Sequence, residues 1–392
     1  MRVGLLTTEF IPGWGGIASY CMNLCKVISK DVDLHIFTTS KPGNGSITKP
    51  ANTEAEFPNV TIHTLSASGD VFLSDIRYQL LAALKIPSLV RDCDIDLLHS
   101  AGPLADQLLR IIGNDIPHIV TYHSTLQGQR QGISNSKVGF WDLDSSEKTT
   151  ILTYPLARAY ESLSLARTTN VIAVSKAVRA DLVDRYGYSK AITVINNGID
   201  LELFQPYEKS NNTPRVIFSG RLVATKGPQV VMKAIPHVLK KHKDTIFTLA
   251  GAGDKRPYVR LAHKLDIPHD RLEFCHVDYK HMPQLYNSAH ILVLPSLLES
   301  FPMSILEGMA CGLPTIASDV GDVSELVRDG ITGFLIPTRD HIALAAKINY
   351  LLENPSLRIL MSQNSRRLVT DDYSAELMGK KTLELYHRVV QN

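Results

Sequence analysis

The chain has 392 residues, of which 44% are hydrophobic and 20% charged, and its net charge is +2. We expect two domains of about 200 residues each, because a single hydrophobic core rarely extends over a chain of this length. The composition excludes a disordered protein. The sequence shows neither the basic stripe of a nucleic-acid partner nor an apolar run of about 18 residues that would span a membrane.

The start of the chain and its cysteines predict where the protein works. MRVGLLTTEF has one basic residue and a short apolar run, unlike a signal peptide. The cysteines are scattered, and no Cys/His group with zinc spacing accompanies Cys21 and Cys25. We therefore expect reduced structural thiols and a cytoplasmic protein, with peripheral contact at the inner face of a membrane left open.

Apolar runs alternate with segments of helical period in the first half of the chain. The amphipathic segments 17–29 and 155–168 are predicted helices. Strands that are apolar on both faces and separated by helices indicate a parallel sheet covered on both sides. The runs that predict strands are 3–8, 33–39, 97–100, 118–124 and 170–175.

After the polar stretch 207–214 the alternation begins again, so the domain boundary is expected near 200–214. Two Rossmann-like domains facing each other across a cleft are the predicted architecture. Residues 373–392 have the apolar spacing of an amphipathic C-terminal helix. The second set of predicted strands is 215–220, 246–251, 271–275, 290–296 and 315–318.

A glycine-rich turn, GWGGIASY, follows the first predicted strand and precedes a helix. Glycines such as Gly13, Gly15 and Gly16 let backbone amides and a helix N-terminus approach an anion closely. The pattern is not GxGxxG, and no acidic residue ends the next strand as a nicotinamide site requires. A purely structural turn is the alternative.

The second half begins with SGRLVATKG, in which Arg221 and Lys226 flank a loop after a predicted strand. Two cations at the carboxyl edge of a parallel sheet are suited to neutralise a diphosphate, Arg as a fork and Lys as a point charge. The alternative is that both are solvated surface charges.

The segment HILVLPSLLESFPMSILEGMACGLPTIAS carries two glutamates eight positions apart, Glu299 in a loop and Glu307 within a helix. Each carboxylate can accept hydrogen bonds from hydroxyls, and the pair suits a ligand rich in vicinal diols. Glu307 lies among apolar and small residues that should be packed, so a solvated helix face explains it poorly. Chance spacing of two common residues is the alternative.

With these segments in order, the chain resembles the retaining glycosyltransferases of family GT4, which have the GT-B fold. The resemblance rests on GGxxxY near the start, SGRL followed by KG, the E-x7-E block, and GDVSELVRDGITGFLI (321–336). It implies that the final helix, about 376–392, crosses back to the N-terminal domain. The implied domains are 1–200 with 376–392 on the acceptor side, and 201–375 for the nucleotide sugar.

The resemblance also implies roles for single residues. Arg221 and Lys226 would bind the diphosphate, with the amide of Gly16 beside Gly15 contributing from the other domain. Glu307 would hold the ribose hydroxyls and Glu299 the transferred sugar. His123, after a first-domain strand, matches the histidine that family members place near the sugar; a structural histidine is the alternative.

Two residues depart from the family pattern. Pro302 replaces a usual glycine and has no N–H to offer a phosphate. Proline is tolerated at a first helical position, and the amides of Met303 and Ser304 remain for phosphate binding. Asp322 stands where a second glycine is common, so the adjacent loop should differ in shape or charge.

The implied reaction transfers a hexosyl unit from a nucleotide-diphosphate sugar to an acceptor hydroxyl with retention of configuration. No DxD motif is placed at a sugar-donor site, so we expect cationic side chains and helix ends to do the work of a metal. We expect no cofactor and no metal, and assign no protein nucleophile. The catalytic set is His123, Arg221, Lys226 and Glu299.

A nucleotide-sugar 2-epimerase of the same architecture and a non-catalytic sugar-nucleotide-binding subunit are the alternatives. The sequence names neither the sugar nor the base, and the acceptor is open among carbohydrate, small-molecule and lipid-linked classes. The polar segment 124–150 is the candidate acceptor-side loop, with a disordered surface excursion as its alternative.

Overall fold

The computed structural model describes residues 1–10, 15–40, 57–67, 71–113, 116–207 and 213–391. Gly13 and positions 208–212 of the expected interdomain stretch lie outside these ranges. The chain forms two compact units. Unit 1 comprises 1–126, 155–198 and 375–392, and unit 2 comprises 127–154 and 199–374.

Unit 1 is built on a seven-stranded parallel sheet with the order β3-β2-β1-β4-β5-β6-β7. The central strands β1, β4, β5 and β6 are short and largely buried, as expected for a sheet with helices on both faces. The order reverses between β1 and β4, which makes their carboxyl ends the topological switch point. The strands are β1 Arg2–Leu6, β2 Asp33–Ser40, β3 Val60–Ala67, β4 Leu97–Ser100, β5 His118–Tyr122, β6 Asn170–Ala173 and β7 Ala191–Val194.

The connections between these strands are those of a doubly wound sheet, because almost every strand is followed by a helix. Two of the strands, β3 and β7, are absent from the apolar runs identified in the sequence. The described helices that lie wholly in unit 1 are α1 Gly16–Ile28, α3 Val71–Asp92, α4 Gln107–Ile112, α7 Lys176–Tyr186 and α15 Ala375–Gln391.

Unit 2 has a six-stranded parallel sheet with the order β10-β9-β8-β11-β12-β13. Its switch point lies between β8 and β11. The strands are β8 Arg215–Ser219, β9 Ile246–Ala250, β10 Leu272–Cys275, β11 Ile291–Leu294, β12 Thr315–Ser318 and β13 Gly333–Ile336. Its helices are α8 Pro228–Leu239, α9 Arg256–Lys264, α10 Met282–Asn287, α11 Met303–Ala310, α12 Val323–Leu326, α13 His341–Glu353 and α14 Pro355–Asp372.

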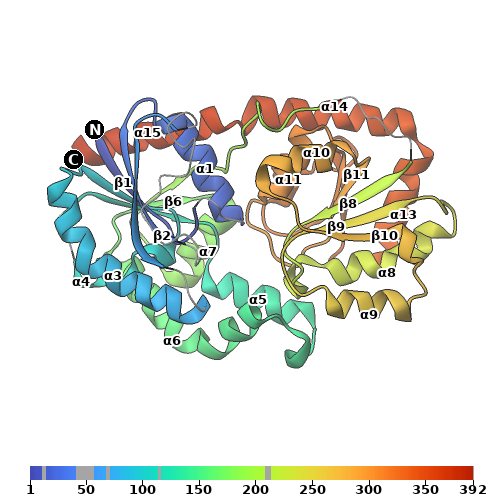
Figure 1. The fold of residues 1–392 in the computed structure, drawn as a ribbon, viewed down its shortest axis with the longest axis horizontal. Helices are drawn as coiled ribbons and strands as arrows, with labels where there is room; N and C mark the ends of the chain where they lie inside the picture. The colour runs from blue at the N-terminus through green and yellow to red at the C-terminus, as the bar shows by residue number, and fades with distance from the viewer. Residues whose placement is uncertain (11–14, 41–56, 68–70, 114–115, 208–212, 392) are drawn as a thin grey trace. The chain divides into compact units, whose positions relative to one another are not determined.

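The final helix α15 packs on unit 1, as the resemblance predicted, and lies along α1 (Figure 1). A side chain at Gly379 would overlap Val27 of α1, with 2.4 Å between its Cβ and Cγ1 of Val27. Tyr386 is fully buried, and its hydroxyl lies 2.6 Å from Nδ1 of His99. Each large apolar side chain buried here contributes about 1.5–3 kcal/mol, which fixes the crossing.

The segment 124–150 is not the polar loop or disordered excursion that the sequence suggested. It forms α5 Leu126–Ser136 and the first part of α6 Ser145–Arg167. Residues 127–154 belong to unit 2, although the sequence placed them in the N-terminal domain. The reason is tertiary packing: Ile133 and Leu143 are buried in one cluster with Ala224. Within the described ranges, no helix is long and apolar enough to cross a membrane.

Candidate active site

The loops after β8 and β11 meet at the switch point of unit 2, where ligands of open parallel sheets bind. Nζ of Lys226 donates to Oε1 of Glu299 at 2.7 Å. The hydroxyl of Ser296 donates to the same carboxylate oxygen, also at 2.7 Å. Glu299 is 7% exposed, so its charge is stabilised by these two partners rather than by water.

Backbone contacts hold the two loops together. The amide of Leu297 donates to the carbonyl of Thr225 at 2.8 Å. Gly227 has φ 77°, and a Cβ there would lie 2.1 Å from the carbonyl oxygen of Pro295. Only glycine allows this approach and this backbone conformation together. The glycine after Lys226 therefore brings the lysine within reach of Glu299.

Glu307 belongs to a second polar group, on α11. Its Oε2 accepts a hydrogen bond from the hydroxyl of Tyr286 at 2.7 Å, and that hydroxyl also lies 2.8 Å from Oγ of Ser219. Burial raises the pKa of Glu307 to about 7, and the Tyr286 bond opposes the rise. Because a tyrosine hydroxyl has one proton, Tyr286 donates to ionised Glu307 and accepts from Ser219.

Pro302 lies one position before the first helical residue of α11, and not at that first position as expected. It is the N-cap residue in extended conformation, and Met303 is the first helical residue. No described residue accepts a hydrogen bond from the amides of Met303 or Ser304. These amides remain available to an anion, as free N–H groups at a helix N-terminus generally are.

The loop that carries Arg221 and Lys226 packs against the beginning of α6. The buried carboxylate of Glu147 accepts from the amide of Thr225 through Oε1 at 3.0 Å. Its Oε2 accepts from the amide of Asp144 at 3.2 Å, which is the return bond of a capping box. The exposed guanidinium of Arg221 donates to Oγ of Ser146 at 3.4 Å.

The loop around Glu299 also rests on the segment from the first half of the chain. A Cβ at Gly132, in α5, would lie 2.6 Å from Cβ of Leu298. Gly321, with φ 55°, approaches the backbone of Glu299 so closely that a Cβ would lie 2.0 Å from its carbonyl oxygen. Asp322, which departs from the family pattern, therefore directly follows a glycine at which a side chain would collide with the backbone of Glu299.

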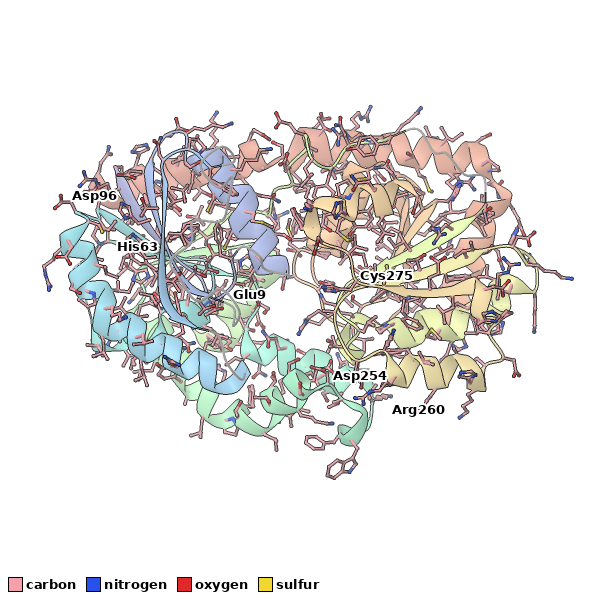
Figure 2. All side chains as sticks on the ribbon, in the orientation of Figure 1. Glu9, His63, Asp96, Asp254, Arg260 and Cys275 are labelled. Carbon is pink, nitrogen blue, oxygen red and sulfur yellow. The ribbon has the colours of Figure 1, made fainter. Side chains whose placement is uncertain are left out.

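The predicted residues of unit 1 lie at the carboxyl edge of its own sheet, after β1 and after β5. Gly15 is the N-cap of α1 with φ 152°, and Gly16 is the first helical residue. A Cβ at Gly15 would lie 2.6 Å from Oε2 of Glu9, a carboxylate that follows β1 (Figure 2). Glycine at position 15 thus lets Glu9 lie against the start of α1.

His123 follows β5 and is partly buried. Its Nε2–H donates to the carbonyl of Ala101 at 3.1 Å, and its ring lies edge-on to Tyr20. Burial lowers the pKa of His123 to about 4, so the imidazole is neutral at pH 7. With Nε2 donating, Nδ1 is the nitrogen that can accept a hydrogen bond.

Sequence reasoning missed Tyr286, Ser219 and Glu147. The first two carry no local signal, because they meet Glu307 only through the fold. Glu147 had a signal: DSSE before a helix has the acidic residues of a capping box.

Comparison with known proteins identifies the family of this chain. The model described as "Glycosyltransferase Family 4" matches residues 14–203, and "Glycosyl transferases group 1" matches residues 200–368. The chain belongs to the GT4-like glycosyltransferases. It is 25% identical to an uncharacterized glycosyltransferase of Methanocaldococcus jannaschii over 98% of each chain. It is 27% identical to alpha-maltose-1-phosphate synthase of Mycobacterium tuberculosis, covering 99% of this chain and 100% of that one.

Solved structures show that this glycosyltransferase has the GT-B fold. Sucrose-phosphate synthase from Thermosynechococcus elongatus superposes with a TM-score of 0.81 at 20% identity, covering 99% of this chain and 98% of that one. HepE from Anabaena, solved in complex with UDP-glucose, superposes with a TM-score of 0.76 at 17% identity, covering 99% and 100%. The GT-B fold and the glycosyltransferase activity predicted from the sequence are thus confirmed.

Proposed function

We propose that this glycosyltransferase moves a hexosyl unit from a nucleotide-diphosphate sugar to a carbohydrate hydroxyl, with retention of configuration and without a metal. The observation that carries the proposal is the Lys226–Glu299 pair at the switch point of unit 2, with Glu307 buried on the following helix. A cation, a sugar-binding carboxylate and a diol-binding carboxylate are the groups that such a sugar donor requires.

Lys226 and Arg221 bind the diphosphate in this proposal. Negative charge grows on the leaving diphosphate during transfer, and fixed cations stabilise it most strongly in the transition state. The amides of Met303 and Ser304 contribute from the start of α11, where the helix dipole also favours an anion. These groups supply the charge stabilisation that a metal would otherwise provide.

Glu307 binds the ribose. Its Oε2 is engaged by Tyr286, while Oε1 has no hydrogen-bond partner among the described residues. A vicinal diol donates two hydrogen bonds, which favour the ionised carboxylate. Tyr286 fixes the carboxylate so that the free oxygen can receive them.

Glu299 binds hydroxyls of the transferred sugar, and its partners Lys226 and Ser296 fix its position. We assign no protein nucleophile: the acceptor hydroxyl attacks from the face that the diphosphate leaves, and a phosphate oxygen takes its proton. Within unit 1, Gly16 begins α1 and neutral His123 has Nδ1 as a hydrogen-bond acceptor, and both stay candidates for the roles that the family resemblance implies. HepE was solved with UDP-glucose and with UDP and glucose, which supports a hexosyl donor here.

The decisive experiment screens nucleotide sugars by thermal shift and then follows transfer to oligosaccharide acceptors by NMR. We expect one donor to stabilise the protein, product with the donor's anomeric configuration, and unchanged turnover in EDTA. An inverted product or loss of turnover in EDTA would contradict the mechanism. Conversion of the donor alone to its 2-epimer would instead identify an epimerase.

A further inference from the structure

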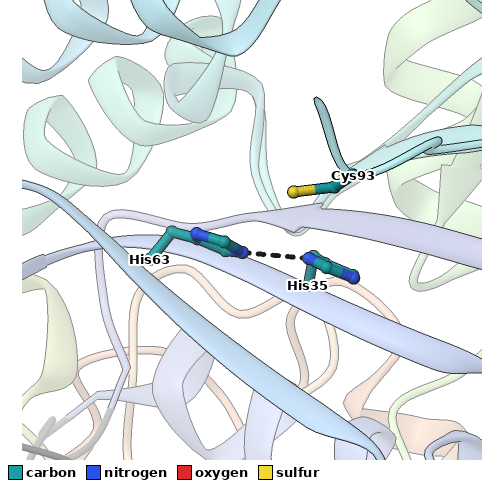
Figure 3. A group of neighbouring side chains, drawn as sticks. All are labelled: His35, His63 and Cys93. Carbon is teal, nitrogen blue, oxygen red and sulfur yellow. Dashed lines mark hydrogen bonds between the residues drawn. The ribbon is translucent and has the colours of Figure 1, made fainter. Parts of the chain in front are cut away.

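Three side chains far apart in the sequence meet in unit 1, away from the glycine and histidine of the candidate active site. They are His35 of β2, His63 of β3 and Cys93, which directly follows α3 (Figure 3). Among the described residues, they are the group whose ligand atoms all lie within 4.8 Å of one another. We propose that His35, His63 and Cys93 form a binding site for a transition-metal ion of the Zn²⁺ class.

The strand register brings the two histidines together. His63 pairs with Phe37, two residues after His35, so both imidazoles project from the same face of neighbouring strands. Nδ1 of His35 lies 2.9 Å from Nε2 of His63. The ring of Phe37 stacks on the ring of His63. The site therefore has apolar atoms on one side and is partly accessible to solvent.

The donor set suits borderline-soft ions. Two imidazoles and one thiolate match the nitrogen and sulfur ligands that Zn²⁺ prefers, and water completes a tetrahedron. With Zn–N bonds of about 2.0–2.1 Å, tetrahedral geometry separates the two nitrogens by about 3.3 Å. An ion that replaces their mutual hydrogen bond needs the two imidazoles to tilt toward it as well as to move apart by a few tenths of an ångström.

Charged groups lie beside two of the ligands. Oδ1 of Asp33 lies 3.9 Å from Nε2 of His35, the nitrogen that does not face His63. A carboxylate behind a metal-bound imidazole fixes its tautomer and raises its basicity. Arg2 pairs with Asp33 at 3.4 Å and donates to the carbonyl of Cys93 at 3.4 Å, which holds the thiol's backbone beside the strands.

The ion would join the edge strand β3 to β2 and to the end of α3. Its role is structural, because His35 and Cys93 lie toward the amino ends of the strands, whereas Gly16 and His123 follow carboxyl ends.

The test titrates purified, metal-stripped full-length protein with Co²⁺ and then Zn²⁺, using a non-thiol reductant. We expect one Co²⁺ per chain with a thiolate-to-cobalt absorption band, displacement by Zn²⁺, and a thermal midpoint that rises with Zn²⁺ concentration. Cys93→Ser should remove the band and His63→Ala should abolish stoichiometric binding.

Two further variants keep the result interpretable. Cys275→Ser removes another half-buried thiol, in unit 2, and should leave the band unchanged (Figure 2). Asp33→Asn should keep the band but weaken Zn²⁺ binding about 10-fold or more, as loss of a carboxylate behind a ligating histidine does. Absence of the band in wild type, or a band that survives in Cys93→Ser, would overturn the proposal.

Discussion

Nζ of Lys226 lies 2.7 Å from Oε1 of Glu299, so the cation proposed for the diphosphate and the carboxylate proposed for the sugar form an ion pair with each other. The lysine is 27% exposed at its side chain and the glutamate 6%. A carboxylate this buried needs its partner, because removing one member of a buried pair leaves an uncompensated charge. The pair thus holds both groups in place while each keeps a free side for the sugar donor.

Lys226→Ala should lower kcat by about 100-fold to 1,000-fold, because the lost charge acts mainly on the leaving diphosphate. The fall should persist with the sugar donor in excess. Steady-state kinetics measure the fall in kcat, with Lys243→Ala, which changes an exposed lysine of the same unit, as the control. Unchanged turnover in Lys226→Ala would show that the lysine does not stabilise the transition state.

The two carboxylates should differ in their kinetic effects. Glu307→Gln removes binding to the unreacting ribose and should mainly raise KM. Glu299→Gln disturbs the transferred sugar, where a shift of about 1 Å can lower the rate about 100-fold, and should mainly lower kcat. Free nucleotide diphosphate should bind Glu299→Gln normally in calorimetry. Lost nucleotide affinity in Glu299→Gln with normal affinity in Glu307→Gln would reverse the roles.

The raised pKa of Glu307 makes folding stability depend on pH. The folded carboxyl titrates at about 7 and the unfolded one at 4.5, so between these values the folded state binds more protons. The contribution of this group to stability is therefore present below pH 4.5 and is lost as pH rises to 7. A shift of this size corresponds to roughly 3 kcal/mol.

Urea unfolding of wild type and Glu307→Gln at pH 5 and pH 8 measures this effect. The free energy of unfolding of wild type should fall relative to the variant as pH rises, because the variant cannot ionise there. A difference between the two proteins that stays constant across this range would contradict the assignment.

Sequence reasoning identified residues that the structure brings together best where those residues directly follow a strand. Lys226 and Glu299 lie in loops that follow strands with clear apolar runs in the sequence. The parallel sheet then brings these two loops together. Tyr286 could not be predicted, because its bond to Glu307 depends on how α10 packs on α11. The segment 124–150 was misjudged for a similar reason: α5 contains glycines and polar residues, and its helix is stabilised by packing that local sequence does not reveal.

Glu147 should act as a positioning residue for the Lys226 loop. Its buried carboxylate accepts from the amides of Thr225 and Asp144, so Glu147→Ala leaves two amides without their acceptor. The loop should loosen, lowering kcat/KM about 10-fold or more, since the cation is then held less well. Glu147→Gln retains one carbonyl oxygen and should recover part of the loss.

The distinguishing measurement is hydrogen exchange, because a loss of activity alone would not show where the structure has changed. In Glu147→Ala the amide of Thr225 should exchange faster, while strand amides of β8 and β9 keep their protection. Glu376→Ala removes an exposed glutamate from the first turn of α15 and should change neither exchange nor kinetics. If the Thr225 amide remains equally protected in Glu147→Ala while activity falls, the glutamate does not work through this loop, and its bond to the Thr225 amide is incidental to transfer.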